Sequence, residues 1–337
     1  MVIFFYFRYK SRLLKFKFNK ISKKIILCNI LISYFFIVIS LQRELWTKYY
    51  FNPVLGDKIT GTVFDPFILF HDNKFKIFVS WRSKGSIALA TSENGIEWSN
   101  LKIVLNKGKA KSWESIVNRG TVVIYNEKLY LYYTGQNNGK SQIGLAISED
   151  GNNFIRQKNN PILKPYYEYE KQSVMIPHVI YDKDEKLFKM WYSAGETAEP
   201  DVICYAISKN GINWIKYKNN PIFKPNKNKL SLDFFKVGGS DVHKISNKKY
   251  LMFYIGYSDI DTARIFIAKS ENGINNWIRS SYPIIKPTKG QFDNDACYKP
   301  SAIYNKKLGK WMIYYNGRKG NTEYIGFALQ RNIKSLI

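Results

Sequence analysis

Short apolar runs, separated by polar turns, recur along most of the chain. Four of them, IALATS, IGLAIS, ICYAIS and IFIAKS, each run into a turn of the form Ser-x-[Asn/Asp]-Gly, beginning at Ser92, Ser148, Ser208 and Ser270. The turns are 56, 60 and 62 residues apart (148 − 92, 208 − 148 and 270 − 208). Asn-Gly or Asp-Gly between strands is a strong hairpin signal, because a type I′ turn needs positive φ at both central positions. The pattern therefore predicts a β protein built from one repeated unit.

Two further strands precede each turn, so that each unit reads as a four-stranded antiparallel meander. The second strands include KIFVSW, LYLYYTG, FKMWYSAG, YLMFYIG and WMIYYNG. A meander of this length is typical of a β-propeller blade with long loops. The first strands of the units are expected at 67–70, 121–125, 177–181, 241–245 and 300–304.

The last unit ends at its third strand, 324–329, and its fourth strand is expected at the other end of the repeat region. Trp46 stands seven residues before Pro53, as Trp214 stands seven before Pro221. Residues 45–55 should therefore complete the last unit and leave no exposed sheet edge. The sequence thus predicts an all-β fold, a five-bladed β-propeller with four antiparallel strands per blade, in one domain over residues 43–332.

Residues 1–42 differ from the rest. The first 24 residues hold eight Lys or Arg and no acid, and the uncharged apolar run IILCNILISYFFIVISL follows at 25–41. A basic and then apolar order is that of a signal peptide or membrane anchor, and it predicts an extracytoplasmic or membrane-anchored domain. The alternative is an upstream start codon that adds a non-functional extension, with the protein then cytoplasmic.

Composition narrows the function. The 337 residues are 45% hydrophobic, which excludes intrinsic disorder, and 52 Lys and Arg against 26 Asp and Glu give a net charge of +26. The lysines outside the N-terminus are scattered, which argues against nucleic acid as a partner. Three separated Cys and three His exclude a disulfide framework and a Cys-based zinc site, and we expect neither metal nor cofactor. The sequence does not indicate an oligomeric state.

Candidate chemistry follows from the predicted geometry. In a propeller the starts of the first strands, and the loops joining strands two and three, open on one face. Asp65, between Phe64 and Pro66, begins the first inner strand, and Glu196 ends Tyr-Ser-Ala-Gly-Glu; two such carboxylates are the minimal apparatus of glycoside hydrolysis. For each charged residue the alternative is structural, such as an Asx turn at Asp65, or an Arg318–Glu323 ion pair. The residues expected to bind substrate on this face are Trp81, Arg82, Arg119, Gln136, His178, Asp241, Asp295, Tyr298, Lys299, Arg318 and Glu323.

The repeat A-x-S-x-[DN]-G-x-x-W followed by N-P-[ILF], with Phe64-Asp65-Pro66 opening the first unit, resembles the arabinanase/levansucrase/invertase group, the five-bladed glycosidases of glycoside hydrolase families 43 and 32. The resemblance covers residues 45–332 and implies that Asp65 is the base or nucleophile. The second unit opens with Asn118-Arg119-Gly120, without the Asp usual in the group, and the third has Ile176 rather than Glu before Pro177. Glu196, one loop later, is therefore our candidate for the acid.

Three functions remain open at this point. The first is a glycosidase acting on a fructosyl, arabinosyl or related sugar. The second is a non-catalytic glycan-binding propeller. The third is a glycoside phosphorylase, in which Arg119, His178, Lys299 and Arg318 surround a phosphate.

Overall fold

The computed structural model describes Asn29 and residues 46–330, and the predicted segment 1–42 lies outside the described residues except for Asn29. No helix in the described part of the chain has the length and apolar character needed to cross a membrane. The described chain is built of strands and two short 3₁₀ helices, η1 (Arg82–Lys84) and η2 (Glu168–Glu170). The expected all-β class is confirmed.

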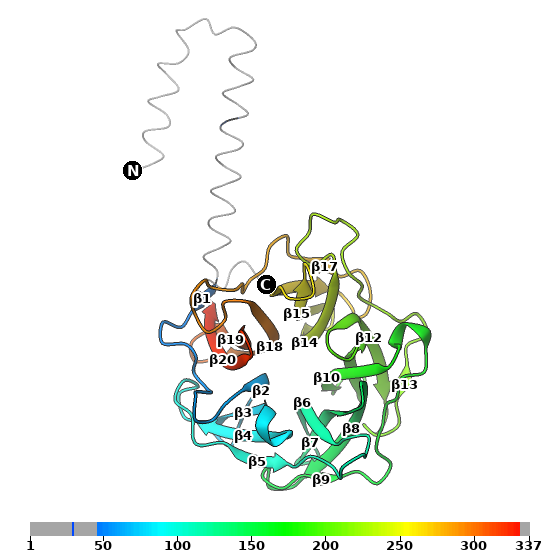
Figure 1. The fold of residues 1–337 in the computed structure, drawn as a ribbon. Coiled ribbons are helices and arrows are strands. Elements are labelled where there is room, and N and C mark those ends of the chain that lie inside the picture. The colour runs from blue at the N-terminus through cyan, green and yellow to red at the C-terminus, as the bar shows by residue number, and fades with distance from the viewer. Residues whose placement is uncertain (1–28, 30–45, 331–337) are drawn as a thin grey trace, which may run out of the picture. The chain divides into compact units, whose positions relative to one another are not determined.

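Within residues 46–330 the strands form four sheets, arranged around a common axis (Figure 1). The first runs in the order β2 (Val63–His71), β3 (Lys74–Trp81), β4 (Ser86–Ser92), β5 (Lys102–Leu105). The second has eight strands: β6 (Ile116–Tyr125), β7 (Lys128–Asn137), β8 (Lys140–Ser148), β9 (Ile155–Arg156), β10 (Ser173–Asp182), β11 (Leu187–Gly195), β12 (Pro200–Ser208), β13 (Ile215–Lys216). The third is β14 (Lys236–Ser246), β15 (Lys249–Tyr257), β16 (Ala263–Ser270), β17 (Ile278–Arg279). The fourth is β18 (Ala296–Asn305), β19 (Lys310–Lys319), β20 (Thr322–Gln330), β1 (Trp46–Lys48).

The eight-stranded sheet consists of two antiparallel meanders, β6–β9 and β10–β13. They are joined by one parallel pairing, of Ser141 in β8 with Ser173 in β10. Each meander therefore has the same strand order as the other sheets, and β2, β6, β10, β14 and β18 are the equivalent inner strands that converge on the axis (Figure 1).

The repeated turn differs in detail from the predicted two-residue hairpin. Gly95 has a φ of 77°, whereas Asn94 is not among the residues with positive φ. The amide of Gly95 donates to Ser92 Oγ at 2.9 Å, and Asn94 Oδ1 accepts from the amides of Ile96 and Glu97, both at 2.9 Å. Side-chain hydrogen bonds thus shape an Asx turn in place of a type I′ turn, and a longer connection follows before β5.

The predicted closure of the last sheet is present. β1 pairs antiparallel with β20, with Trp46 opposite Gln330. Downstream, the Asn52 side chain accepts from the amide of Phe327 at 2.8 Å and donates to its carbonyl at 2.9 Å. Asn220 makes the same two bonds to Tyr205 in the third meander. The N-terminal strand therefore occupies the place of an outer strand.

A buried carboxylate recurs just before four of the five inner strands. In each case it accepts a hydrogen bond from a tyrosine of the second strand and pairs with a cation of the outer strand. Because Lys48 of β1 supplies the cation for the last sheet, this network also ties the N-terminal strand to the fold. The four sets are Glu114 with Tyr133 and Arg156, Glu170 with Tyr192 and Lys216, Asp233 with Tyr254 and Arg279, and Asp293 with Tyr315 and Lys48.

The core lies between neighbouring sheets. Successive side chains of a strand point to opposite faces, so in β11 Met190 and Tyr192 pack towards the preceding meander, with Tyr132, while Trp191 packs towards the following sheet, with Tyr250. This alternation fills both interfaces from one strand and leaves the axial ends of the inner strands for polar residues.

Candidate active site

Each inner strand is bulged at its start, and one residue of each bulge has a left-handed backbone. The pairing of β2 with β3 shifts between Phe64 and Phe67, and the other four inner strands shift at the equivalent place. A side-chain-bearing residue in this region is strained by about 1–3 kcal/mol, and such strain clusters at functional sites. The five equivalent residues are Asp65 (φ 52°), Arg119 (55°), Ile176 (51°), Gly239 (56°) and Lys299 (32°).

Side-chain oxygens of the neighbouring unit hold four of these bulges in place. The amide of Arg119 donates to Ser80 Oγ at 2.8 Å, and that of Ile176 to Thr134 Oγ1 at 2.9 Å. The amide of Gly239 likewise donates to Ser193 Oγ at 2.9 Å, and that of Asp65 to Asn316 Oδ1 at 3.3 Å. The second strand of one sheet therefore fixes the direction of the bulge residue on the next.

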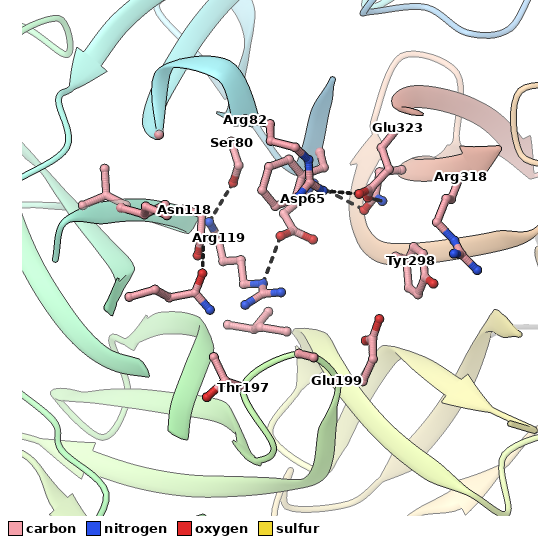
Figure 2. A pocket seen from close by; sticks show the side chains of 18 of the residues that line it. Asp65, Ser80, Arg82, Asn118, Arg119, Thr197, Glu199, Tyr298, Arg318 and Glu323 are labelled. Atoms are coloured by element: carbon pink, nitrogen blue, oxygen red, sulfur yellow. Dashed lines mark hydrogen bonds and ion pairs between the residues drawn. The ribbon is translucent and has the colours of Figure 1, made fainter. Parts of the chain in front are cut away.

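A cavity of about 590 Å³ is lined by three of these bulge residues, Asp65, Arg119 and Ile176 (Figure 2). Its wall comes from β2, β3, η1, β6, β7, β10, β15, β18, β19 and β20, and from the β11–β12 loop. The polar and aromatic side chains that line it are Phe64, Asp65, Ser80, Trp81, Arg82, Asn118, Arg119, Gln136, Thr197, Glu199, Tyr257, Tyr298, Asn316, Arg318 and Glu323.

Asp65 lies in this wall as an ion-paired carboxylate. It is 6% exposed, and Arg119 Nε donates to its Oδ2 at 3.1 Å (Figure 2). The Arg119 side chain is itself largely buried, and its Nη1 contacts the sulfur of Met175 at 3.3 Å. Two residues with strained backbones, on adjacent inner strands, thus form an ion pair in the cavity wall.

Glu199 supplies a second carboxylate to the same cavity, from the loop between β11 and β12 (Figure 2). Tyr257 Oη donates to its Oε2 at 2.5 Å. Burial raises the pKa of Glu199 to about 7; the charges of Asp65 and Glu323 act in the same direction, whereas the Tyr257 hydrogen bond and Arg119 oppose the rise. A carboxyl group of this kind holds a proton near neutral pH.

Glu323 of β20 is a third carboxylate in the wall. It pairs with Arg82, and Asn316 Nδ2 donates to its Oε2 at 2.6 Å. Burial raises the pKa of Glu323, although Arg82 opposes the rise. Glu323 thus forms its ion pair with Arg82. The Arg318–Glu323 ion pair that the sequence offered as an alternative is not formed.

Eight of the predicted site residues line the cavity together. Arg82 is stacked above the Phe64 ring, 4.5 Å from its centroid, and the Trp81 indole donates to the carbonyl of Thr60 at 2.9 Å. The Gln136 side chain accepts from Asn118 Nδ2 at 2.6 Å. The eight are Asp65, Trp81, Arg82, Arg119, Gln136, Tyr298, Arg318 and Glu323.

Glu196, the predicted acid, does not line the cavity. Its side chain is 52% exposed and accepts from Lys171 Nζ at 2.6 Å, and Lys171 also pairs with Asp201 at 2.8 Å. This salt-bridge network holds Glu196 at the surface, while Glu199, three residues later, is turned inward to Tyr257. The structure therefore does not bring Glu196 together with Asp65 in the cavity.

His178 and Asp241, predicted to bind substrate, lie deeper along the inner strands and outside the cavity lining. His178 Nδ1 lies 3.0 Å from Asp241 Oδ1, and His243 Nε2 lies 3.0 Å from Oδ2, which also accepts from the Ala302 amide at 2.6 Å. Although burial alone would raise it, the pKa of Asp241 is held well below its usual range by His243 and His178. Burial lowers the pKa of His178. These groups join inner strands to one another, which corrects their predicted role.

Lys299 and Asp295 also lie outside the cavity lining. Lys299 is fully buried, and its Nζ has no hydrogen-bond partner among the described residues; burial lowers its pKa. Asp295 shapes a loop, accepting from Asn294 Nδ2 at 2.6 Å and from the Gly320 amide at 2.7 Å. The structure therefore does not bring either residue together with the eight predicted residues of the lining.

Two cavity residues, Glu199 and Tyr257, escaped the sequence analysis. The segment Gly195-Glu-Thr-Ala-Glu199 holds two glutamates, and no local pattern distinguishes the inward one. Tyr257 ends β15 opposite Lys236, at the place where the other second strands carry Trp81, Gln136, Gly195 and Arg318. Within residues 46–330 no group of three or more His, Cys, Asp and Glu side chains is arranged to hold a metal ion.

A cavity on which acids, arginines and aromatic rings converge has the character of a small-molecule binding site. The sequence matches the family described as "Glycosyl hydrolases family 32 N-terminal domain" over residues 88–272. The chain belongs to this family, which confirms the expected enzyme class and the suspected propeller glycosidase group. A comparison with curated protein sequences found no significant match.

Solved structures share the fold at low sequence identity. A structure described as an RGII complex matches with a TM-score of 0.70 and 19% identity, covering 87% of this protein and 94% of the other. A thermostable family-43 glycoside hydrolase matches with a TM-score of 0.66 and 19% identity, covering 83% and 92%. A third, from work on the GH130 family of mannoside phosphorylases and on glycoside hydrolases that target β-1,2 mannosidic linkages, matches with a TM-score of 0.65 and 15% identity, covering 84% and 93%.

Proposed function

We propose that the protein is a glycoside hydrolase in which Asp65 is the base or nucleophile and Glu199 is the general acid. The observation that carries the proposal is that both carboxyl groups line one cavity in opposite environments. Asp65 is ion-paired with Arg119, while burial raises the pKa of Glu199 to about 7. Carboxyl groups whose surroundings separate their protonation states are the usual mark of an acid and base pair.

The catalytic roles of the two carboxyl groups follow from these environments. Protonated Glu199 donates its proton to the leaving glycosidic oxygen, and the Asp65 carboxylate attacks the anomeric carbon or activates water. Arg119, which donates to Asp65 Oδ2, holds this carboxylate in its position in the cavity wall. Tyr257, which donates to Glu199 Oε2, leaves the other oxygen of that carboxyl group available to the substrate.

The rest of the cavity suits a sugar. Trp81 and Tyr298 offer ring faces on which a pyranose or furanose can stack, and Gln136 and Asn118 carry amide groups for hydroxyls. A fructosyl, arabinosyl or related sugar remains the proposed substrate class. We also propose that the four sheets form five blades, with β1 completing the fifth.

The test is turnover by Asp65→Asn and Glu199→Gln on a glycan panel. Each substitution keeps side-chain size and removes the reacting group, so each should lower kcat by about 10²–10⁴-fold while sugar binding survives. Glu196→Gln is the matched control, because Glu196 is a nearby glutamate outside the cavity, and it should retain full activity. Loss of activity in Glu196→Gln with retention in Glu199→Gln would reverse the assignment, and a fully active Asp65→Asn would refute the mechanism. If the wild-type protein binds glycans but cleaves none of them, the result would favour a non-catalytic glycan-binding function.

Phosphorolysis is the second candidate, because three arginines, Arg82, Arg119 and Arg318, line the cavity. Of the four residues expected to surround a phosphate, Arg119 and Arg318 are cavity residues and His178 and Lys299 are not. Assays with and without inorganic phosphate separate the two reactions, since a phosphorylase releases a sugar phosphate and a hydrolase a free sugar.

We further propose that residues 1–42 act as a signal peptide or membrane anchor and that the domain works outside the cytoplasm. Their basic and then uncharged apolar sequence supports this placement.

A further inference from the structure

The cavity holds three arginines and three carboxyl groups, and two of each are paired. Arg119 pairs with Asp65, and Arg82 pairs with Glu323. The third carboxyl group, Glu199, has a pKa raised to about 7 by burial and so carries little charge below neutral pH. The charge of the third arginine, Arg318, is therefore not balanced within the cavity.

Hydrogen bonds within the described residues use only part of the Arg318 guanidinium. Its Nη2 donates to the backbone carbonyl of Asp261 at 2.7 Å, and the carboxylate of Asp261 is 3.9 Å away and 80% exposed. Its Nε is buried and has no hydrogen-bond partner among the described residues. The guanidinium carbon lies 5.9 Å from the centroid of the Tyr298 ring, beside the cavity (Figure 2).

A buried donor without an acceptor is costly, and a guanidinium binds planar oxyanions in particular. We propose that Arg318 is the binding residue for an oxyanion in the cavity, either a carboxylate carried by the sugar or a free phosphate. The inference rests on the proposed function in taking a sugar as the ligand of this cavity. Since the chain has a net charge of +26, its field also attracts anionic ligands.

The experiment measures binding by titration calorimetry at fixed ionic strength and pH 6. The probes are galacturonic and glucuronic acid, their neutral counterparts galactose and glucose, and inorganic phosphate. The variants are Arg318→Met and Lys319→Met, which remove the same charge from neighbouring residues; Lys319 is exposed and outside the cavity lining. Thermal melts confirm that each variant is folded.

We expect the wild type and Lys319→Met to bind at least one anionic probe more tightly than the neutral sugars. Arg318→Met should lose this preference, with affinity falling on the order of tenfold to a hundredfold, because a hydrogen bond to a charged group is at stake. Preference for the acidic sugars places the anion on the glycan, and preference for phosphate identifies it as a co-substrate. Arg318→Lys should retain part of the affinity, since it keeps the charge but not the planar fork.

The proposal is overturned if no anion binds better than the neutral sugars, or if Lys319→Met loses as much affinity as Arg318→Met. Because binding is measured without turnover, the result is separate from the mechanism. Full activity in Asp65→Asn would refute the proposed acid and base pair and leave the role of Arg318 standing.

Discussion

Glu199→Gln should alter both the pH dependence of activity and that of stability. The substitution replaces the carboxyl by an amide of the same size, whose oxygen still accepts from Tyr257. In the wild type, burial raises the pKa of Glu199 from the ordinary value of 4.5 to about 7. The folded state therefore keeps a proton that the unfolded state releases over this range.

The sign of the stability effect follows from proton linkage. Below pH 4.5 the group is protonated in both states and has no effect. As the pH rises from 4.5 to about 7, the folded state loses stability relative to the unfolded state, at about 1.4 kcal/mol per pH unit. Above pH 7 the total reaches about 3.5 kcal/mol, which corresponds to roughly 6 °C in Tm for a domain of this size.

Thermal unfolding of the wild type and Glu199→Gln between pH 4 and 9 is the assay. The melting temperature of the variant relative to the wild type should rise across this window and level off above pH 7. In parallel, kcat/KM of the wild type should fall as pH rises through about 7, because the acid loses its proton. Glu196→Gln, at an exposed glutamate, should change neither profile. A constant difference in melting temperature at all pH values, or an activity that is flat through pH 7, would refute the reasoning.

The other predictions concern closure, the outer-strand ion pairs and the N-terminal segment. Deletion of residues 1–55 removes β1 and should unfold the protein, whereas deletion of 1–42 should not; equal melting temperatures for the two truncations would contradict closure by β1. Lys48→Met leaves the buried Asp293 carboxylate without its cation and should lower the free energy of unfolding by about 3 kcal/mol in chemical denaturation. Lys74→Met, which breaks the exposed pair with Glu93, should lower it by less than about 1 kcal/mol. Equal losses would show that the buried pair stabilises the fold no more than the exposed one. Full-length protein should fractionate with membranes or be exported, and recovery wholly in the soluble cytoplasmic fraction would favour the start-codon explanation.

Much of the fold was predictable because the repeat is local. The Ser-x-[Asn/Asp]-Gly turn and its flanking apolar strand recur at nearly constant spacing, and each copy needs contacts only within a few residues. The alignment of Trp46 with Trp214 also predicted that β1 completes the last sheet, and Lys48 indeed takes the same place there as Lys216 in the third meander. Asp65 was found because its position at the start of an inner strand is itself a feature of the repeat.

The candidate site was only partly predictable, because its geometry depends on contacts between sheets. Alternation along a strand indicates which side chains face the axis but not how deep each lies, so that His178 and Asp241 belong to a layer below the cavity. Lys171 pairs with Glu196 at the surface, whereas Tyr257, from another sheet, donates a hydrogen bond to Glu199 in the cavity. These two contacts determine which glutamate lines the cavity.

The sequence alone thus determined the repeated strands, their closure and the first catalytic candidate, since each is encoded in short segments. Only the tertiary structure decided which carboxyl group has a raised pKa, which arginine has no carboxylate partner in the cavity lining, and which polar residues join the strands. Those properties arise from burial and from charges that lie tens to hundreds of residues apart in the sequence. A local sequence pattern therefore does not indicate them.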